Sequence, residues 1–293
     1  PPAAVVDTVT GMEDLTISDV LAPSSPAMKA ARAFADAGHR LYLVGGSLRD
    51  AWLRRAHGDL DFATDAAPEV TRKIVSPLAS AVWLQGIEFG TVGAEVGGIA
   101  MEITTFRTET YESGSRHPAV EFASDIETDL SRRDFTVNAM ALRVTGAAGE
   151  APELIDPFGG VADLANGVLR TPLSPEESFS DDPLRMLRAA RFIAGFHLFP
   201  DPSIAQAIGE LRERLEIVSA ERIRDELDKL VVVDAPAAGL WFLHDTGLAE
   251  QFLPELPALR LEHDPIHRHK DVLSHTIAVV DNVRPPKRPG PDG

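Results

Sequence analysis

The sequence of 293 residues contains no cysteine, which excludes disulfide bonds, thiolate metal sites and cysteine nucleophiles. No apolar run approaches the ~18 residues that a membrane-spanning helix needs. The first residues lack the basic and then apolar pattern of a secretion signal, so we expect a soluble, cytoplasmic protein. Basic residues are also scarce: 28 face 45 acidic residues, a net charge of −17. This balance argues against broad, nonspecific nucleic-acid binding, so any RNA partner requires local basic patches.

The chain does contain a motif-rich segment between residues 41 and 64. It opens with a short apolar run, residues 41–44, which is typical of a buried strand. Gly45 and Gly46 follow, and glycine lets the backbone turn sharply or approach a ligand closely. The pattern therefore predicts a strand, a tight turn and a helix in succession.

The helix expected after this turn carries the features of an anion site. Ser47 precedes the helical pattern and Asp50 stands three residues later, which predicts a capping box. A helix N-terminus leaves free N–H groups that suit a phosphate. Arg49 in the first turn adds a charge-assisted contact to the same anion.

The next strand places two acids on one face. Residues two apart on a strand point to the same side, so Asp59 and Asp61 face together while Leu60 and Phe62 point into a core. Neighbouring carboxylates repel unless a cation lies between them, and oxygen ligands suit Mg²⁺. With the phosphate site, this pair predicts metal-assisted nucleotidyl transfer. Two solvated loop acids, or the Asp-x-Asp metal site of a glycosyltransferase, are the alternatives that the upstream turn disfavours.

Further candidates follow in the first half of the chain. Glu102 lies inside an apolar strand, either as an edge carboxylate facing water or as a third acid near the metals. Residues 107–129 are polar and predict a long functional loop. Arg132 and Arg133 at an expected helix start are unfavourable for the helix dipole unless an anion compensates. They therefore predict contact with a nucleotide, with a solvated helix end as the alternative.

The second half of the chain favours helices. One helix, capped by Ser180, carries a polar row of residues three apart: Asp182, Arg185, Arg188 and Arg191. The acid and an arginine can pair with each other, or present an acceptor beside a donor fork to the edge of a base. The arginines outnumber the acid, which favours ligand contact. Four histidines between residues 263 and 275 suggest a metal site only weakly.

Taken together, the motifs resemble the bacterial tRNA nucleotidyltransferase/poly(A) polymerase family, class II branch, and most closely its CCA-adding members. The resemblance covers roughly residues 38–260. The matching motifs are, in order, Gly45 to Asp50, Asp59 to Asp61, Glu102 to Arg107, Arg132 to Ala139, Asp156 to Asp163, Asp182 to Arg185 and Ser219 to Ile223.

The resemblance implies an α+β fold with a polymerase-beta-like nucleotidyltransferase head, a mixed sheet with helices, followed by a helical neck and body. The implied divisions are an N-terminal arm (1–20), the catalytic head (21–155), a neck with the base-reading helix (156–230), an RNA-binding body (231–262) and the start of an incomplete HD-like domain (263–293). Because the rest of that domain is missing, no hydrolase activity is expected.

The resemblance also implies residue roles. Asp59 and Asp61 are the catalytic residues and hold two Mg²⁺ ions. The implied nucleotide-binding residues are Gly46 and Arg49 at the triphosphate, Arg133 and Asp134 at the sugar, Asp182 and Arg185 at the base, and Arg188 and Arg191 nearby. One departure is that the family's Glu-Asp pair is Asp181-Asp182 here, which leaves the role of the first acid open.

The activity so implied is template-independent addition of CCA to tRNA 3′ ends from CTP and ATP, with release of pyrophosphate. Poly(A) or A-only addition shares the catalytic residues, and we see no basic insert of the poly(A) branch after the metal strand. A non-catalytic tRNA-binding module is a further alternative, which the intact acids and arginines disfavour.

Overall fold

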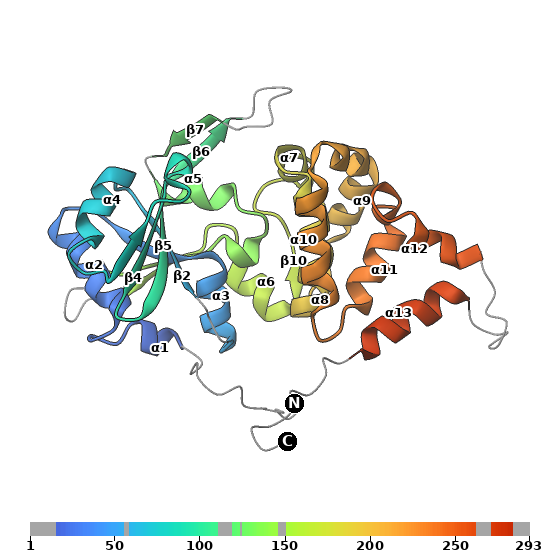
Figure 1. Ribbon diagram of the computed structural model, residues 1–293, viewed down its shortest axis with the longest axis horizontal. Coiled ribbons are helices and arrows are strands. Elements are labelled where there is room, and N and C mark those ends of the chain that lie inside the picture. The colour runs from blue at the N-terminus through green and yellow to red at the C-terminus, as the bar shows by residue number, and fades with distance from the viewer. Residues whose placement is uncertain are drawn as a thin grey trace, which may run out of the picture. The chain divides into compact units, whose positions relative to one another are not determined.

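The computed structural model describes residues 16–55, 59–110, 119–123, 125–145, 151–261 and 271–283. The chain divides into two compact units, residues 1–161 and residues 162–293 (Figure 1). Among the described helices, none has both the length and the apolar character that crossing a bilayer requires.

The first unit is built on a seven-stranded sheet. The strand order is β3 (Ala81–Trp83), β4 (Thr91–Val96), β5 (Ile99–Thr105), β2 (Asp59–Thr64), β1 (Leu41–Val44), β8 (Ala141–Arg143) and β9 (Glu153–Ile155). Strands β2 and β5 are parallel, and the other neighbours are antiparallel. The sequence predicted β1, β2 and the apolar strand around Glu102 that is β5, because apolar runs and alternation along a strand are local signals.

One face of this sheet packs on a large apolar core. Leu60 and Phe62 of β2 point into it, with side chains from α2 (Pro26–Asp36) and α4 (Pro68–Val75). Ser25 caps α2 by accepting from the Met28 amide, and Gly38, with φ +80°, follows its end.

A smaller core covers part of the opposite face. It joins Tyr42 and Val44 of β1 to Phe106 and to Ile126 and Leu130 of α5 (Ile126–Ser131). This core lies over β1, the end of β2 and β8, so it covers the middle of the sheet on that side.

The segment predicted as a long loop, residues 107–129, contains regular structure instead. Strands β6 (Arg107–Thr110) and β7 (Ala119–Phe122) pair as an antiparallel hairpin, and α5 follows. The sequence prediction missed these strands because their residues are mostly polar and show no clear apolar alternation. Residues 111–118, between the strands, lie outside the described part.

Helices make up nearly all of the second unit, as expected. They are α7 (Pro175–Asp181), α8 (Leu184–Phe196), α9 (Pro202–Leu211), α10 (Ala220–Val231), α11 (Ala237–Asp245), α12 (Glu255–Ala258) and α13 (Val272–Asn282). A two-residue parallel pair, β10 (Val168–Leu169) with β11 (Phe199–Pro200), is the addition that the sequence did not show. The α+β fold, a mixed-sheet head followed by helices, is confirmed.

Helix α8 is the centre of the second unit, and α10 and α11 pack against it. Met186, Ala190 and Ile193 are buried on one face, as their spacing predicted. Gly239 of α11 lies against the Ala190 carbonyl, where a Cβ would come within 2.5 Å of the oxygen. The close approach of these two helices therefore depends on that glycine. The finer division into neck, body and HD-like start stays a prediction. Residues 262–270, which contain three of the four histidines between residues 263 and 275, lie outside the described part.

Candidate active site

Helix α3 (Gly45–Leu53) begins one turn earlier than the sequence suggested. Val44 is its N-cap residue and makes no side-chain cap, and Gly45 has φ +64°. The predicted capping box of Ser47 and Asp50 is therefore wrong. Because the two glycines form the first turn themselves, Ser47 already lies within the helix and its side chain points inward.

Ser47 fastens the acidic strand to α3. Its hydroxyl is buried, donates to the Asp59 carbonyl oxygen at 3.3 Å and accepts from the Asp61 amide at 2.8 Å. Ser47 thereby sets the position of the first residues of β2 relative to the glycine turn. Sequence reasoning missed this contact, since it joins residues 12 and 14 positions apart.

The two acids of β2 lie as predicted, on the face opposite the large core. Leu60 and Phe62 are each 1% exposed, whereas Asp59 is exposed and Asp61 is partly buried. Glu102 of β5 is directly in register with Asp61 and is exposed. The strand pairing therefore places three carboxylates on one stretch of the sheet.

Burial, together with the charges of Asp59 and Glu102, raises the pKa of Asp61 to about 6, although Arg133 and the hydrogen bond from Ser47 oppose this rise. A carboxylate in that environment gains most from a nearby cation. Across the described residues there is no group of three or more His, Cys, Asp or Glu side chains placed to hold a metal ion. The candidate metal site thus rests on Asp59 and Asp61, whose oxygens suit a divalent ion that keeps other ligands from water or substrate.

Arg133 and Asp61 meet at Gly45. A Cβ on Gly45 would lie 2.7 Å from Nη1 of Arg133 and 4.0 Å from Oδ2 of Asp61. Arg133 also pairs with Asp129 at 3.0 Å, which holds its guanidinium in place. The sequence identified each of these groups, and the structure brings the glycine, the acid and the arginine together.

Arg132 and Arg133 lie at the end of a helix, whereas the sequence predicted that they lie at a helix start. Arg132 is the C-cap of α5 and Arg133 follows it, so both lie at a helix C-terminus. Cations are favourable at that end, and the argument that an anion must compensate them is wrong. The case for Arg133 rests instead on its proximity to Asp61.

Arg49, 6% exposed, anchors a buried polar network. It pairs in two-point fashion with Asp50, with both distances 2.8 Å, and donates to Oδ1 of Asn138. The Asn138 amide donates to Asp134 at 2.8 Å, and Asp134 also accepts from the Phe135 amide. Asn138 therefore connects the predicted triphosphate and sugar residues, a role that sequence reasoning did not assign. Gly46 lies beside this network, with its Cβ position 3.5 Å from Nη2 of Arg49.

In the second unit, Asp182 ends α7 and precedes α8. Its carboxylate accepts from the Leu184 amide at 3.2 Å and pairs with Arg222 of α10 at 3.2 Å. Ser180 lies inside α7, so its predicted role as the cap of the next helix is wrong. Pro183 occupies the N-cap position of α8 and offers no capping side chain. The Asp182 carboxylate accepts the hydrogen bond from the free Leu184 amide that a serine cap was predicted to accept.

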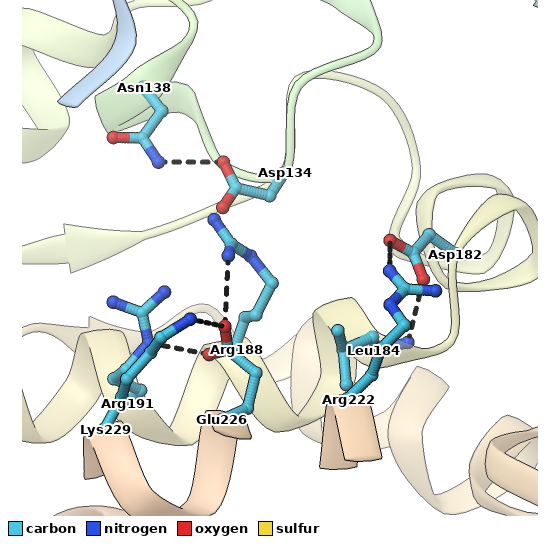
Figure 2. Close-up of polar contacts among 9 residues, drawn as sticks. All are labelled: Asp134, Asn138, Asp182, Leu184, Arg188, Arg191, Arg222, Glu226 and Lys229. Carbon is cyan, nitrogen blue, oxygen red and sulfur yellow. Dashed lines mark hydrogen bonds and ion pairs between the residues drawn. The ribbon is translucent and has the colours of Figure 1, made fainter. Parts of the chain in front are cut away.

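Arg185 is buried and donates to the Ser178 hydroxyl at 3.0 Å. Its neighbours in the polar row, Arg188 and Arg191, contact Glu226 of α10 at 3.4 Å and 2.7 Å (Figure 2). Both guanidinium groups also lie near the Phe192 ring, at 5.8 Å and 5.1 Å.

Glu226 is the counterion that the sequence argument lacked. It is 3% exposed and also pairs with Lys229 at 3.3 Å (Figure 2). Burial alone raises its pKa, but Arg191, Arg188 and Lys229 together hold the pKa below the usual value. The row of arginines was judged too basic for pairing only because this acid is 35 residues away in the chain.

Two family models match the chain. One, described as "Poly A polymerase head domain", covers residues 41–170, and the other, "Probable RNA and SrmB- binding site of polymerase A", covers residues 195–259. The first contains Asp59, Asp61 and Arg133, and the two together account for most of the described residues.

Curated relatives are CCA-adding enzymes. That of Bacillus subtilis (strain 168) is 38% identical over 249 residues, which are 85% of this chain and 58% of the relative. That of Streptococcus suis is 41% identical over 75% of this chain and 52% of the relative. The chain thus spans a little over half the length of the curated relatives it matches.

Solved structures agree with these relatives. The Bacillus stearothermophilus CCA-adding enzyme in complex with CTP has a TM-score of 0.66 and 36% identity, over 78% of this chain and 53% of that one. A CCA-adding enzyme in apo form II has a TM-score of 0.70 and 27% identity, over 80% and 56% of the two chains. From the two family models, these relatives and the paired acids of β2, we conclude that the chain belongs to the tRNA nucleotidyltransferase/poly(A) polymerase family, whose members use divalent metal ions.

Proposed function

We propose that this chain carries the catalytic part of an enzyme that adds CCA to the 3′ ends of tRNA from CTP and ATP. The observation that carries the proposal is the convergence of Asp61, Arg133 and Gly45, with Asp59 beside them on β2. The likeness to CCA-adding enzymes, one of them solved with CTP, supports the choice of reaction. We also propose a cytoplasmic location, which a tRNA substrate supports.

In the proposed reaction, the terminal ribose hydroxyl of the RNA attacks the α-phosphorus of the incoming nucleotide. A new P–O bond forms, the bond from the α-phosphorus to the bridging oxygen breaks, and pyrophosphate leaves with that electron pair. The hydroxyl proton passes to water. Mg²⁺ ions held by Asp59 and Asp61 would activate the hydroxyl and neutralise the leaving charge.

The chain's own groups bind and orient the reactants. Arg133 places a cation against the acidic pair, where a triphosphate or ribose oxygen can accept a hydrogen bond. Arg49, with its two-point pair to Asp50, keeps the glycine turn rigid, so the backbone at Gly46 is held for a phosphate. Asp134, through Asn138, belongs to the same supporting network.

Base selection is assigned to α8 of the second unit. We propose that Asp182 accepts a hydrogen bond from the amino group that CTP and ATP share, and that Arg185 donates beside it. UTP and GTP present a carbonyl at that place, which a carboxylate repels, and a mismatched buried polar group is heavily penalised. Arg188 and Arg191 support nucleotide binding from the same helix, with Glu226 fixing their positions.

The nearest alternative is A-only or poly(A) addition, which one observation favours: the matched head-domain family is named for poly(A) polymerase. The two activities separate in one assay. Incubation of the chain with Mg²⁺ and tRNA that ends before CCA, with CTP, ATP or both, should give two C residues, no addition, and CCA, respectively. Addition of A alone to that tRNA, or a growing A tail, would replace the proposal with the alternative.

The RNA substrate has its own test. With a net charge of −17, RNA contact must come from local basic patches, and each phosphate contact releases counterions. We expect tRNA affinity to fall steeply between 50 and 200 mM salt, on the order of tenfold or more. An affinity that stays flat over this range would contradict the RNA-substrate assignment.

A further inference from the structure

Trp83 of β3 lies in an unusual arrangement with its cross-strand neighbour, Gly93 of β4. A Cβ on Gly93 would lie 1.8 Å from Nε1, 2.0 Å from Cε2 and 2.5 Å from Cδ1 of the indole. No side chain larger than glycine's hydrogen fits under the ring as it lies. The indole therefore lies directly against the Gly93 backbone, and Trp83 as a whole is only partly buried.

The strand register places this indole on the same face of the sheet as the acidic residues. Trp83 pairs with Gly93, Gly93 with Glu102 and Glu102 with Asp61 across β3, β4, β5 and β2. Residues directly opposite on adjacent strands share a face of the sheet. The ring over Gly93 thus lies one strand spacing from Glu102 and two spacings, about 10 Å, from Asp61.

In the described part of the chain, the residues that β3, β4 and β5 place on this face belong to neither of the two apolar cores. Val82 and Leu84, the neighbours of Trp83 in sequence, pack on the large core of the opposite face, and the small core lies over β1, β2 and β8. Beside the indole, the face carries Thr91 and Thr104, whose hydroxyls are 2.9 Å apart, and small or acidic side chains. This face of the sheet therefore carries the acids of β2 at one end of a row of cross-strand neighbours and the Trp83 indole at the other.

We propose that the Trp83 indole stacks on a base at the single-stranded 3′ end of the RNA acceptor and so positions the terminal hydroxyl at Asp59 and Asp61. The inference rests on the proposed function. A flat aromatic surface stacks on any base, because every base has a π-face, and such contacts need no particular hydrogen-bond pattern. That tolerance suits an acceptor whose last base changes as nucleotides are added.

The charge of this face favours a base over the phosphate backbone. Glu95 and Glu102 are exposed on this face, along with Asp59. Carboxylates repel phosphates, so the RNA can approach here with its base toward the sheet and its backbone outward. Glycine at position 93 is then explained by function, since it lets the ring lie low enough to leave room for a stacked base.

The first test uses fluorescence. The chain has three tryptophans, so Trp52→Phe with Trp241→Phe leaves Trp83 as the reporter. An RNA minihelix with a single-stranded 3′ end is added with Mg²⁺ and without nucleotide. We expect quenching of Trp83 by the natural end and much weaker quenching by the same RNA with abasic nucleotides at its 3′ end. Equal quenching by both RNAs, or none by either, would overturn the stacking proposal.

The second test uses kinetics. Trp83→Leu should raise the KM for the tRNA acceptor about tenfold, the effect of losing one aromatic stack, with the KM for CTP little changed. Trp83→Phe keeps a flat ring and should restore most of the loss. Gly93→Ala keeps the indole but forces it off the strand, and should act like Trp83→Leu. Trp52→Leu, on the exposed end of α3, is the matched control and should leave the acceptor KM unchanged.

The outcomes separate the two proposals. Normal CCA addition, with an unchanged acceptor KM in Trp83→Leu, would reject the stacking role and leave the proposed function intact. An unsubstituted chain that adds no nucleotide to tRNA would reject the proposed function itself. Because the fluorescence experiment leaves residue 83 unsubstituted, it decides the proposal even if Trp83→Leu does not fold.

Discussion

The acids of β2 and the arginines of α8 are both clusters of like charge, and they differ in how far neighbouring residues neutralise that charge. In the first unit, Asp59, Asp61 and Glu102 lie on one stretch of sheet, and the pKa of Asp61 rises to about 6. In the second, Arg188 and Arg191 share a buried acid whose pKa is held below its usual value. Burial and neighbouring like charges disfavour the ionised form of Asp61, which a cation would relieve, whereas the arginines are balanced within the fold.

This difference shows which cluster is evidence of a ligand by itself. A repulsive cluster lowers stability, so it persists where binding or chemistry requires it. A balanced cluster contributes to the fold whether or not a ligand binds. The acidic pair therefore supports a metal site directly, while ligand contact by the arginine row needs an experiment that separates binding from folding.

The largest expected effect is on the acids. Asp59→Asn or Asp61→Asn should reduce nucleotide transfer at least a hundredfold, since the loss of a metal ligand removes several kcal/mol of transition-state stabilisation. Glu102→Gln, the matched change on the neighbouring strand, should cost less than tenfold if the pair alone holds the metals. The rates of CMP and AMP addition measure both. An Asp61→Asn variant that keeps more than about a tenth of the rate would contradict the metal site.

In metal-free protein, Asp61→Asn should increase the stability of the fold, although it reduces the rate of nucleotide transfer. The pKa of Asp61 is raised from 3.8 to about 6, so the folded state binds the proton more tightly than the unfolded state. Stability from this group is present below pH 4 and is lost as pH rises toward 6. Asp61→Asn should therefore raise the Tm by a few degrees above pH 6 and leave it unchanged near pH 4. Thermal unfolding with chelator present at both pH values checks this, and a lower Tm at pH 8 would contradict the repulsive environment.

Removal of the counterion tests the second unit. Glu226→Ala leaves Arg188, Arg191 and Lys229 without their shared acid and should destabilise the protein by about 3–5 kcal/mol. Glu221→Ala, an exposed acid on the same helix, should change stability by less than about 0.5 kcal/mol. Denaturant unfolding measures both variants.

The pH dependence of Glu226 has the reverse sign from that of Asp61. Because its folded pKa lies below the usual 4.5, its contribution is present above pH 4.5 and is lost as pH falls below that value. The stability gap between the unsubstituted protein and Glu226→Gln should narrow on acidification. A gap that widens would mean that burial, and not the arginines, dominates this carboxylate.

Base reading gives a smaller, selective effect. Asp182→Ala should lose discrimination against UTP and GTP by about tenfold or more, since one decade corresponds to ~1.4 kcal/mol of differential binding. Arg222→Ala breaks the ion pair with Asp182 but keeps the acceptor, so it should keep the selectivity. Incorporation of the four nucleotides into tRNA measures this. Equal loss of selectivity in the two variants would make Asp182 a structural partner of Arg222.

The smallest effect is expected on the stability of Arg222→Ala. The Arg222 side chain is 55% exposed, and exposed ion pairs contribute about 1 kcal/mol or less. Unfolding of this variant should therefore lie close to that of the unsubstituted protein. A loss comparable to that of Glu226→Ala would show that exposure is a poor guide to the strength of these pairs.

The sequence by itself determined much of the first unit. Strands β1, β2 and β5 and the outward face of Asp59 and Asp61 were predictable, because apolar runs and alternation along a strand are local properties. The buried face of α8 was predictable from helical spacing in the same way. The order of the motifs, each weak alone, indicated the family.

Tertiary structure alone decided which groups meet. Ser47 joins β2 instead of capping a helix, and Arg132 and Arg133 follow a helix end instead of starting a helix. Glu226 supplies the counterion of the arginine row, which the sequence alone did not indicate. Each error concerns either a contact between segments that are distant in the sequence or the residue at which a helix begins or ends. Periodicity shows which face a side chain occupies, but not which residue of another element lies opposite, because that depends on how the elements pack.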